Sequence, residues 1–399
     1  MARNAYLAAG RRSPIGAFGG SLKSLRATEI ATGTASVLLQ SCGVAPWHVQ
    51  IVIAGMVLQD MTESNPARIV ALRLGVPEAV PAYTLNMQCC SGMLALIQAA
   101  QQVSQGNGDC ALIIGLESMS NAPHMVPGSR WGFRLSDGCF VDSLRECTLA
   151  GSKMWGDPWY MIDVAENHAK TDGITRREMD EYAVVSHTRS VRASDAGRFV
   201  SEIATIEARD ARGKLSRVSA DEHPRRDVSY DSLAALPSVR PGGTITAGNA
   251  AGLNDGAAVA LICSDSGLAK LGLTPLAKID LSGTALVGCD PRLMGYSCVH
   301  ALEAALRSAG SSVDKLDLIE CNEGFAVQLL ACERMGKWPR ERLNVDGGSI
   351  GLGHPVGMSG ARIAIHLAHA LQQRRLRWGA ATVPAGSGLG AAVLLERCG

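Results

Sequence analysis

Short buried strands alternate with longer helical stretches along most of this chain, and glycines mark the turns between them. Continuous apolar runs bounded by turn residues predict strands at Val49–Met56, Ala111–Gly115 and Leu316–Glu320. Helical periodicity predicts helices at Ile30–Gln40, Met93–Gln105, His300–Ser308 and Ser359–Gln373. This alternation is typical of layered α/β proteins, because helices cover strands that are buried on both faces.

The two halves of the chain contain a weak internal repeat at an offset of 267 residues. The offset places Gly43 on Gly310 and Val49 on Leu316, so both segments read as helix, glycine turn and buried strand. It also carries Cys89 to Val356, two residues from His354, and each neighbourhood is a small-residue turn that opens a helix. Two similar halves would present Cys89 and His354 from corresponding turns. Chance similarity between two α/β segments is the alternative.

The charge and cysteine content exclude several classes of protein. Lys and Arg number 38 against 37 Asp and Glu, which leaves no polybasic surface for nucleic acid or an anionic membrane. No apolar run is long enough to span a membrane, and a strand-like segment at Ala5–Ala9 begins too early to leave room for a signal peptide. Twelve cysteines in 399 residues are too sparse for a disulfide scaffold, so reduced thiols in the cytoplasm are expected.

Three side chains are candidates for chemistry. Cys89 stands just before a predicted helix, where backbone N–H groups and the helix dipole would stabilise a thiolate and lower its pKa. His354 also opens a helix, where the dipole favours the neutral imidazole that can accept a thiol proton. Asn322 follows the second repeated strand, and its amide could orient a water or stabilise an oxyanion. Taken singly, each is more often an inert structural residue.

Neither a dinucleotide site nor a metal site is expected. The segment G-S-G-L-G ends at Gly390, and the nine residues after it are too few for a βαβ unit. A strand with a glycine bend, whose N–H groups could line an oxyanion site, fits better. The chain has no C-x-x-C pair, and the spacing of His366 and His369 comes with no carboxylate, so no metal ligand set is predicted.

Several long motifs in order give the chain its resemblance to a known family. They are RRSPIGAFGGSL, NMQCCSGM, GLESMSNAPH, GTITAGNAAGLNDGAA, NEGFAVQ and NVDGGSIGLGHPVGMSGAR. The chain resembles the thiolases, in the group of acetyl-CoA acetyltransferases and 3-ketoacyl-CoA thiolases. The resemblance implies a five-layered αβαβα fold from two similar halves and a homodimer or homotetramer. It also implies the division 1–119 with 250–270 for the N-terminal half, 120–249 for a loop domain over the CoA site, and 271–399 for the C-terminal half.

The resemblance also assigns roles to residues. Cys89 would be the nucleophile that takes an acyl group from a CoA thioester, and His354 the base that activates it. Asn322 would hold a water that forms one oxyanion hole with His354, and the N–H groups of Cys89 and Gly386 would form the other. Arg225 matches a position near the CoA phosphates, and the pantetheine tunnel would be lined by Met161, Ala251, Gly252 and Phe325. CoA thioesters are then substrates, and no permanently bound cofactor is implied.

The chain departs from the family at the position of its second catalytic cysteine. The motif C-x-G-x-G, whose cysteine moves the proton at the α-carbon of acetyl-CoA, here begins with Pro384. A related branch places that cysteine in the NEAF-like loop, where this chain has Gly324. Smaller departures are Tyr160 for a histidine, Ala251 for a serine, Asp346 for an asparagine and Ile162-Asp163 for a small pair. The CoA tunnel is therefore expected to be altered.

Three functions are consistent with this pattern. The first is a thiolase-type acyltransferase that condenses or thiolyses short 3-ketoacyl-CoA through a thioester on Cys89. The second is a specialised acyltransferase or decarboxylative condensing enzyme, because loss of CO₂ generates a carbanion without a second cysteine. The third is a weakly active thiolase homologue with a binding role.

Overall fold

A ten-stranded mixed sheet forms the framework of the computed structural model, which describes residues 3–151, 156, 158–209 and 212–399. The strand order is β12-β13-β14-β11-β1-β10-β5-β3-β4, with β2 paired to β10. Its strands are β1 (Ala5–Arg12), β2 (Gly16–Ala17), β3 (Ile51–Gly55), β4 (Ala82–Leu85), β5 (Cys110–Ser118), β10 (Asn254–Cys263), β11 (Ala277–Gly288), β12 (Leu318–Cys321), β13 (Trp378–Ala385) and β14 (Leu389–Arg397). The strands expected from the sequence at β1, β3, β5 and β12 are confirmed.

The pairing pattern joins two related halves. In the first half β3 is parallel to β4 and β5, and in the second half β12 is parallel to β13. The central strand β1 is antiparallel both to β10 and to β11, so it connects the two halves edge to edge. The repeated helix–turn–strand segments end in β3 and β12, as the internal repeat predicts.

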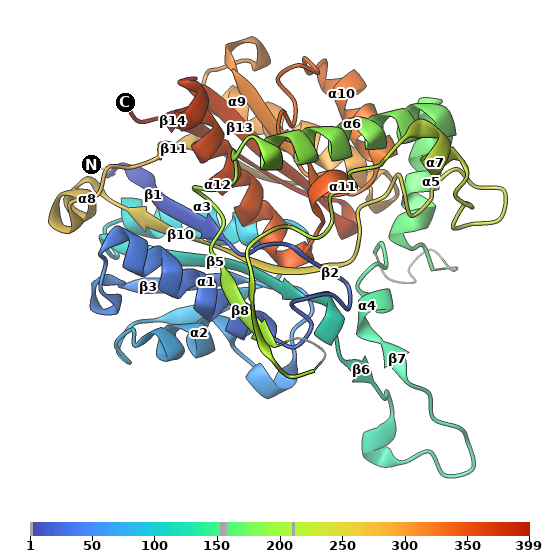
Figure 1. The fold of residues 1–399 in the computed structure, drawn as a ribbon, viewed down its shortest axis with the longest axis horizontal. Coiled ribbons are helices and arrows are strands. Elements are labelled where there is room, and N and C mark those ends of the chain that lie inside the picture. Colours follow the sequence, from blue (N-terminus) through green and yellow to red (C-terminus); the bar gives the residue numbers. More distant parts are fainter. Residues whose placement is uncertain (1–2, 152–155, 157, 210–211) are drawn as a thin grey trace.

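Helices lie on the two outer sides of the structure and between its two sets of strands, so that helices and strands alternate as αβαβα (Figure 1). The helices are α1 (Ala27–Cys42), α2 (Pro66–Leu74), α3 (Ser91–Ser104), α8 (Asp265–Leu271), α9 (Ser297–Ser308), α10 (Ala326–Gly336), α11 (Ser349–Leu352) and α12 (Val356–Arg374). Helices α3 and α12 contact each other and strands of both halves, so they form the central layer. One apolar core lies under α1 and α2, one under α9 and α10, and the third surrounds α3 and α12. The αβαβα expectation is confirmed.

The chain ends as two antiparallel strands joined by a bend. Strands β13 and β14 are linked by a turn at Gly386–Gly388, where Ser387 has a φ of 63° and Gly388 a φ of 75°. Left-handed φ angles of this kind are available to glycine at little cost and to few other residues. The strand with a glycine bend expected from G-S-G-L-G is confirmed.

Residues 120–249 contribute no strand to the ten-stranded sheet over the part that the structure describes. They form α4 (Ser143–Glu146), α5 (Met161–Asp172), α6 (Arg176–Asp195) and α7 (Tyr230–Ala234), with the strand pairs β6 (His124–Met125) with β7 (Val141–Asp142) and β8 (Ile206–Arg209) with β9 (Leu215–Val218). The β6–β7 segment projects away from the body of the molecule (Figure 1). Helices α5 and α6 pack on α10, beside the C-terminal half.

A buried ionic network ties this segment to β1. The Arg12 side chain donates to Glu202 at 2.8 Å and to both oxygens of Asp221, at 2.6 and 2.9 Å. Glu202 also lies 3.0 Å from Nδ1 of His366 in α12. Burial disfavours every charge here, but the cations outweigh it and hold the pKa of Glu202 well below its usual value.

Arg12→Met is expected to lower the free energy of unfolding by about 3–5 kcal/mol, because it removes the cation that pairs with Asp221 and one of the cations that pair with the buried Glu202. The matched control is Arg3→Met, which breaks a half-exposed pair with Asp109 and should cost less than about 1 kcal/mol. Urea denaturation of the two variants beside the wild type measures both effects. Equal midpoints for the two variants would contradict this account of the network.

Candidate active site

The N-terminal ends of α3 and α12 lie against each other, which brings the turns before them together. Gly92 makes this approach possible, because a Cβ there would lie 2.7 Å from the carbonyl oxygen of Gly357. Cys89 precedes α3 by two residues and His354 precedes α12 by two. Val356, at the start of α12, packs in the same small apolar cluster as Cys89. The corresponding turns of the two halves therefore meet, as the internal repeat predicts.

Glu117, at the end of β5, fixes this junction. Its carboxylate accepts hydrogen bonds from the N–H groups of Val57 at 3.1 Å, Leu58 at 3.0 Å and Gly357 at 2.9 Å. The side chain is fully buried, and burial raises its pKa to about 7 although the three N–H groups oppose this. Sequence reasoning missed Glu117, although it lies in the quoted motif GLESMSNAPH. An acidic residue at the end of an otherwise apolar strand was the available signal.

The Cys89 thiol is half-buried, and its sulfur faces the backbone N–H groups of Gly386 and of Cys89 itself. Those donors lower its pKa, as expected from the turn, but burial has the larger effect and raises the pKa to about 11. The charge of Glu117 acts in the same direction as burial. The expectation of a lowered pKa is therefore wrong for the free protein. Cys89 is a protonated thiol that needs a base.

This pKa predicts slow alkylation of Cys89. At pH 7 only about one thiol in 10⁴ would be ionised, so iodoacetamide should modify Cys89 far more slowly than an ordinary exposed cysteine. The rate should rise with pH up to about 11, since the thiolate is the reactive form. Peptide mapping after timed alkylation measures it, with the exposed Cys139 in the same sample as the internal control. Faster alkylation of Cys89 than of Cys139 at pH 7 would contradict the raised pKa.

The hydrogen bonds of His354 define its tautomer. Its Nδ1 lies 2.6 Å from the Ser359 hydroxyl, and that hydroxyl donates its only hydrogen to the carbonyl of Pro355 at 2.8 Å. Ser359 must therefore accept from Nδ1–H, which leaves Nε2 with a lone pair that can accept a proton. Burial is the main cause that lowers the pKa of His354 to about 4, and the Arg362 charge adds to it. The neutral imidazole expected from the sequence is confirmed, with burial rather than the helix dipole as its main cause.

Asn254 fixes the backbone of the His354 turn. Its Oδ1 accepts the His354 N–H at 2.9 Å, and its Nδ2 donates to the carbonyl of Gly16 at 3.0 Å. Sequence reasoning did not single out Asn254 or Ser359. Ser359 stands in the same motif as His354, five residues later. Nothing in its identity indicates that it sets a tautomer.

Asn322 is buried directly after β12. Its backbone N–H donates to the carbonyl of Thr382 on β13 at 3.1 Å. Its side-chain Oδ1 accepts the hydroxyl of Ser349 at 2.7 Å. The NH₂ end of the amide is thus the end that remains to donate to a bound group.

Pro384 lies near the end of β13, and Gly386 opens the turn that follows this strand. Gly386 presents its N–H to Cys89, and a Cβ at Gly386 would lie 3.5 Å from Sδ of Met161. Pro384 is buried two residues earlier and is paired with Gly390. It has no N–H and no ionisable atom.

The other two cysteines near these motifs in sequence are engaged elsewhere. The Cys90 thiol donates to the carbonyl of Val383 at 3.2 Å, and the Cys321 thiol donates to the sulfur of Cys298 at 3.7 Å. Neither contact involves Cys89 or His354.

The residues expected to line the tunnel lie around the Asn322 loop. Ala251 donates its N–H to the carbonyl of Gly324 at 3.0 Å, and Phe325 forms a β-bridge with Ala250. Gly252 packs under the ring of His223, which a side chain at this position would displace.

Arg225 is exposed, and its backbone N–H donates to Nδ1 of His187 at 3.2 Å. His187 is stacked on His223, with 5.9 Å between the ring centroids. Burial first, and the neighbouring positive charge next, lower the pKa of His223 to about 4. The Arg225 side chain therefore supplies a cation close to two neutral rings.

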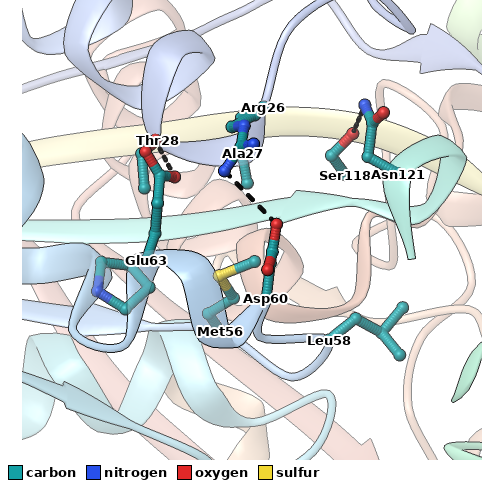
Figure 2. Close-up of a pocket in the computed structure, with 10 residues that line it drawn as sticks. Arg26, Ala27, Thr28, Met56, Leu58, Asp60, Glu63, Ser118 and Asn121 are labelled. Atoms are coloured by element: carbon teal, nitrogen blue, oxygen red, sulfur yellow. Dashed lines mark hydrogen bonds and ion pairs between the residues drawn. The ribbon is translucent and has the colours of Figure 1, made fainter. Parts of the chain in front are cut away.

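A separate small pocket lies between α1 and the turn after β3 (Figure 2). Its charged groups already have partners: Arg26 contacts Asp60 at 3.4 Å, and Glu63 pairs with Arg73 at 2.6 Å and accepts from Thr28 at 2.6 Å. None of the predicted site residues lines it. Paired groups of this kind leave little capacity to bind a substrate, so the turns at Cys89 and His354 remain the better candidate site.

Comparisons with known proteins agree with this geometry. The sequence matches the family models for the thiolase N-terminal domain at residues 5–266 and the thiolase C-terminal domain at residues 273–397. It is 41% identical to the acetyl-CoA acetyltransferase of Chromobacterium violaceum over 392 residues, which is 98% of this chain and 99% of that one.

Two solved structures are similar over their whole length. The acetyl-CoA acetyltransferase of Bacillus anthracis has a TM-score of 0.94 at 39% identity, covering 100% of this chain and 99% of that one. Human mitochondrial 3-ketoacyl-CoA thiolase in complex with CoA also has a TM-score of 0.94 at 39% identity, covering 99% and 98%. Among the described residues, no helix combines the length and apolar character needed to cross a membrane.

Proposed function

The chain belongs to the thiolase family of acyltransferases, and on that premise we propose how its own residues carry out acyl transfer. Cys89 takes an acyl group from a CoA thioester, and the enzyme then condenses or thiolyses short 3-ketoacyl-CoA. The observation that carries this proposal is the meeting of two turns. The turn of Cys89, with the Gly386 N–H at its sulfur, lies against the start of the helix that follows His354.

In the first half-reaction, Nε2 of His354 accepts the Cys89 thiol proton as the sulfur attacks the thioester carbonyl. The N–H groups of Cys89 and Gly386 stabilise the oxyanion of the tetrahedral intermediate. The C–S bond to CoA then breaks, and the CoA thiolate takes the proton back from His354. The raised pKa of Cys89 and the lowered pKa of His354 keep both groups neutral until substrate arrives.

In the second half-reaction, the α-carbon of a second acyl-CoA must lose a proton before it attacks the Cys89 thioester. Asn322, through a water, would stabilise the resulting enolate oxygen, and His354 would add a second donor only while Nε2 carries a proton, since an unprotonated Nε2 can only accept. Pro384 stands where the family places the thiol that removes this proton, and proline cannot transfer one. Loss of a positioned acid or base typically costs 10²–10⁴-fold in rate, so ordinary condensation and thiolysis are expected to be slow.

The lack of an acid or base at position 384 favours a second candidate function. A decarboxylative condensing enzyme forms the carbanion by loss of CO₂, and the remaining Cys89, His354 and Asn322 are sufficient for that chemistry. A weakly active homologue with a binding role is the third option. The neutral His354 tautomer and the N–H donors at Cys89 favour a working nucleophile over this third option.

For substrate binding we propose that CoA and its thioesters are transient ligands, with no permanently bound cofactor. The exposed Arg225 would contact the CoA phosphates. The pantetheine arm would pass between Met161, which borders Gly386, and the strip formed by Ala251, Gly252 and Phe325. The proposed division is residues 1–119 with 250–270, the loop domain 120–249, and residues 271–399.

We propose a homodimer or homotetramer. Four large apolar side chains on or near the projecting β6–β7 segment are exposed, and such surfaces are typical of protein interfaces. They are Met125, Trp131, Leu135 and Phe140. We also propose a cytoplasmic location, supported by twelve unpaired cysteines, which persist in a reducing compartment.

The function is tested by product chromatography of the purified protein with two substrate pairs. Acetoacetyl-CoA with CoA should yield acetyl-CoA if the protein is a thiolase. Acetyl-CoA with malonyl-CoA should yield CO₂ and a 3-ketoacyl product if it is a decarboxylative enzyme. Absence of turnover with both pairs would leave only the binding role.

A further inference from the structure

The orientation of the Asn322 amide depends on a residue that the proposed mechanism does not use. The backbone beside Asn322 is held by Asn344, which accepts the Cys321 N–H at 2.8 Å and donates to the Cys321 carbonyl at 2.9 Å. These bonds do not restrain the side-chain amide, whose two ends are nearly equal in shape. Ser349 makes the contact that distinguishes them, by donating its hydroxyl to Oδ1 at 2.7 Å.

Arg362 determines the direction of that contact. It lies on α12, is buried, and donates from Nη2 to the Ser349 hydroxyl at 3.0 Å. A guanidinium can only donate, and a hydroxyl has one hydrogen. Ser349 therefore accepts from Arg362, which leaves its one hydrogen available for the 2.7 Å bond to Oδ1 of Asn322, and the NH₂ end of the amide points away from Ser349. A charged donor also strengthens the second bond of such a chain.

Arg362 influences both His354, through its charge, and Asn322, through its hydrogen bond to Ser349. Its charge is one of the two causes that keep His354 neutral, after burial. The carboxylates of Glu320 and Glu323 lie close enough to offset that charge. Glu323, next to Asn322, accepts from Tyr182 at 2.5 Å, from Ser186 at 2.7 Å and from the N–H of Ile350 in α11 at 3.1 Å. Glu323 thus fixes the position of α11, the helix that carries Ser349, and with it the position of the Ser349 hydroxyl.

We propose that Ser349 is a positioning residue for the reaction, backed by Arg362. It holds the Asn322 amide in the one orientation that presents NH₂ to the oxyanion water. This inference rests on the proposed function, because it assumes that Asn322 acts in the second half-reaction. It goes further by naming the group that selects the active orientation of Asn322.

The test separates the two half-reactions in Ser349→Ala. Acylation of Cys89 by acetyl-CoA uses the N–H groups of Cys89 and Gly386, so its rate should match the wild type. The overall reaction is measured as thiolysis or as decarboxylative condensation, depending on which one the wild type performs. Its kcat should fall on the order of tenfold, the effect of one lost hydrogen bond, while KM stays nearly unchanged. Ser349→Thr, which keeps the hydroxyl, should restore kcat.

Controls keep the outcomes distinct. Thr34→Val removes another buried hydroxyl bond, to the carbonyl of Ile30 at 2.8 Å in α1, and should leave both half-reactions unchanged. If Ser349→Ala does not fold, Ser349→Cys, a near match in size and a weaker donor, should show a smaller loss confined to kcat. Unchanged kcat in these variants, or equal losses in acylation and turnover, would overturn the positioning role. Absence of acylation in the wild type would instead refute the proposed function itself.

Discussion

Cys89→Ala is expected to lower the rate of acyl transfer by about 10⁴-fold or more, the range seen when a covalent nucleophile is removed. The reason is that the neighbouring thiols are engaged elsewhere. Cys147, which packs in the same apolar cluster as Cys89, donates its thiol to the carbonyl of Leu144 at 3.0 Å. Cys90 directs its thiol to the carbonyl of Val383, and Cys321 directs its thiol into a cluster with Cys298. The Gly386 N–H would then face a methyl group. Initial rates with the preferred substrate pair measure the effect.

The matched control is Cys90→Ala. It removes the neighbouring thiol at the first turn of α3 while leaving the Cys89 sulfur and its N–H donors in place, so the variant should stay active. If Cys90→Ala lost activity as completely as Cys89→Ala while both remained folded, the assignment of the nucleophile to Cys89 would be wrong. Full activity of Cys89→Ala would also contradict the assignment of the nucleophile to Cys89.

Pro384→Cys is expected to raise the rate of thiolysis by about 10²-fold or more, the contribution of a positioned general acid or base. Pro384 is buried two residues before Gly386, whose N–H faces Cys89, and we expect a thiol in its place to lie close enough to the site to move the α-proton. Strand β13 pairs Pro384 with Gly390, and a cysteine would keep this extended backbone while adding a thiol. Thiolysis of acetoacetyl-CoA, followed by product chromatography, measures the gain.

Pro384→Cys both removes the proline ring and adds a thiol, and Pro384→Ala separates these two effects. It removes the proline ring and its backbone restraint but adds no ionisable group, so its thiolysis rate should stay near that of the wild type. A gain equal to that of Pro384→Cys would mean that the ring, and not the missing thiol, limits the reaction. A wild type that already thiolyses as fast as Pro384→Cys would mean that another group moves the α-proton.

The fold was largely predictable because its signals are local and repeated. Apolar runs and glycine turns located β3, β5, β12, α3 and α12, and the repeat related the two halves. The pairing of β1 with β11, which joins the halves, depends on contacts across more than 260 residues that leave no local pattern. The network at Arg12 escaped prediction for the same reason, since Glu202 and Asp221 lie far away in the sequence.

For the candidate site, the sequence indicated which turns meet but not the electrostatics of their side chains. The turn before α3 indicated Cys89, but the expected sign of its pKa shift was wrong. The expectation considered the N–H groups and dipole at the helix end, and it left out the burial of the sulfur, which has the larger effect. For His354 the dipole and burial act in the same direction, so the expectation held. Ser349 could not be found from the sequence, since its role depends on the meeting of α11, α12 and the loop after β12.

The acyl-thioester on Cys89 is the central claim, and intact-protein mass spectrometry after incubation with acetyl-CoA tests it most directly. We expect one acetyl group per chain, mapped to the peptide that contains Cys89, released by added CoA and absent from Cys89→Ala. A wild-type protein that gains no acetyl group, or an adduct that survives in Cys89→Ala, would contradict the account.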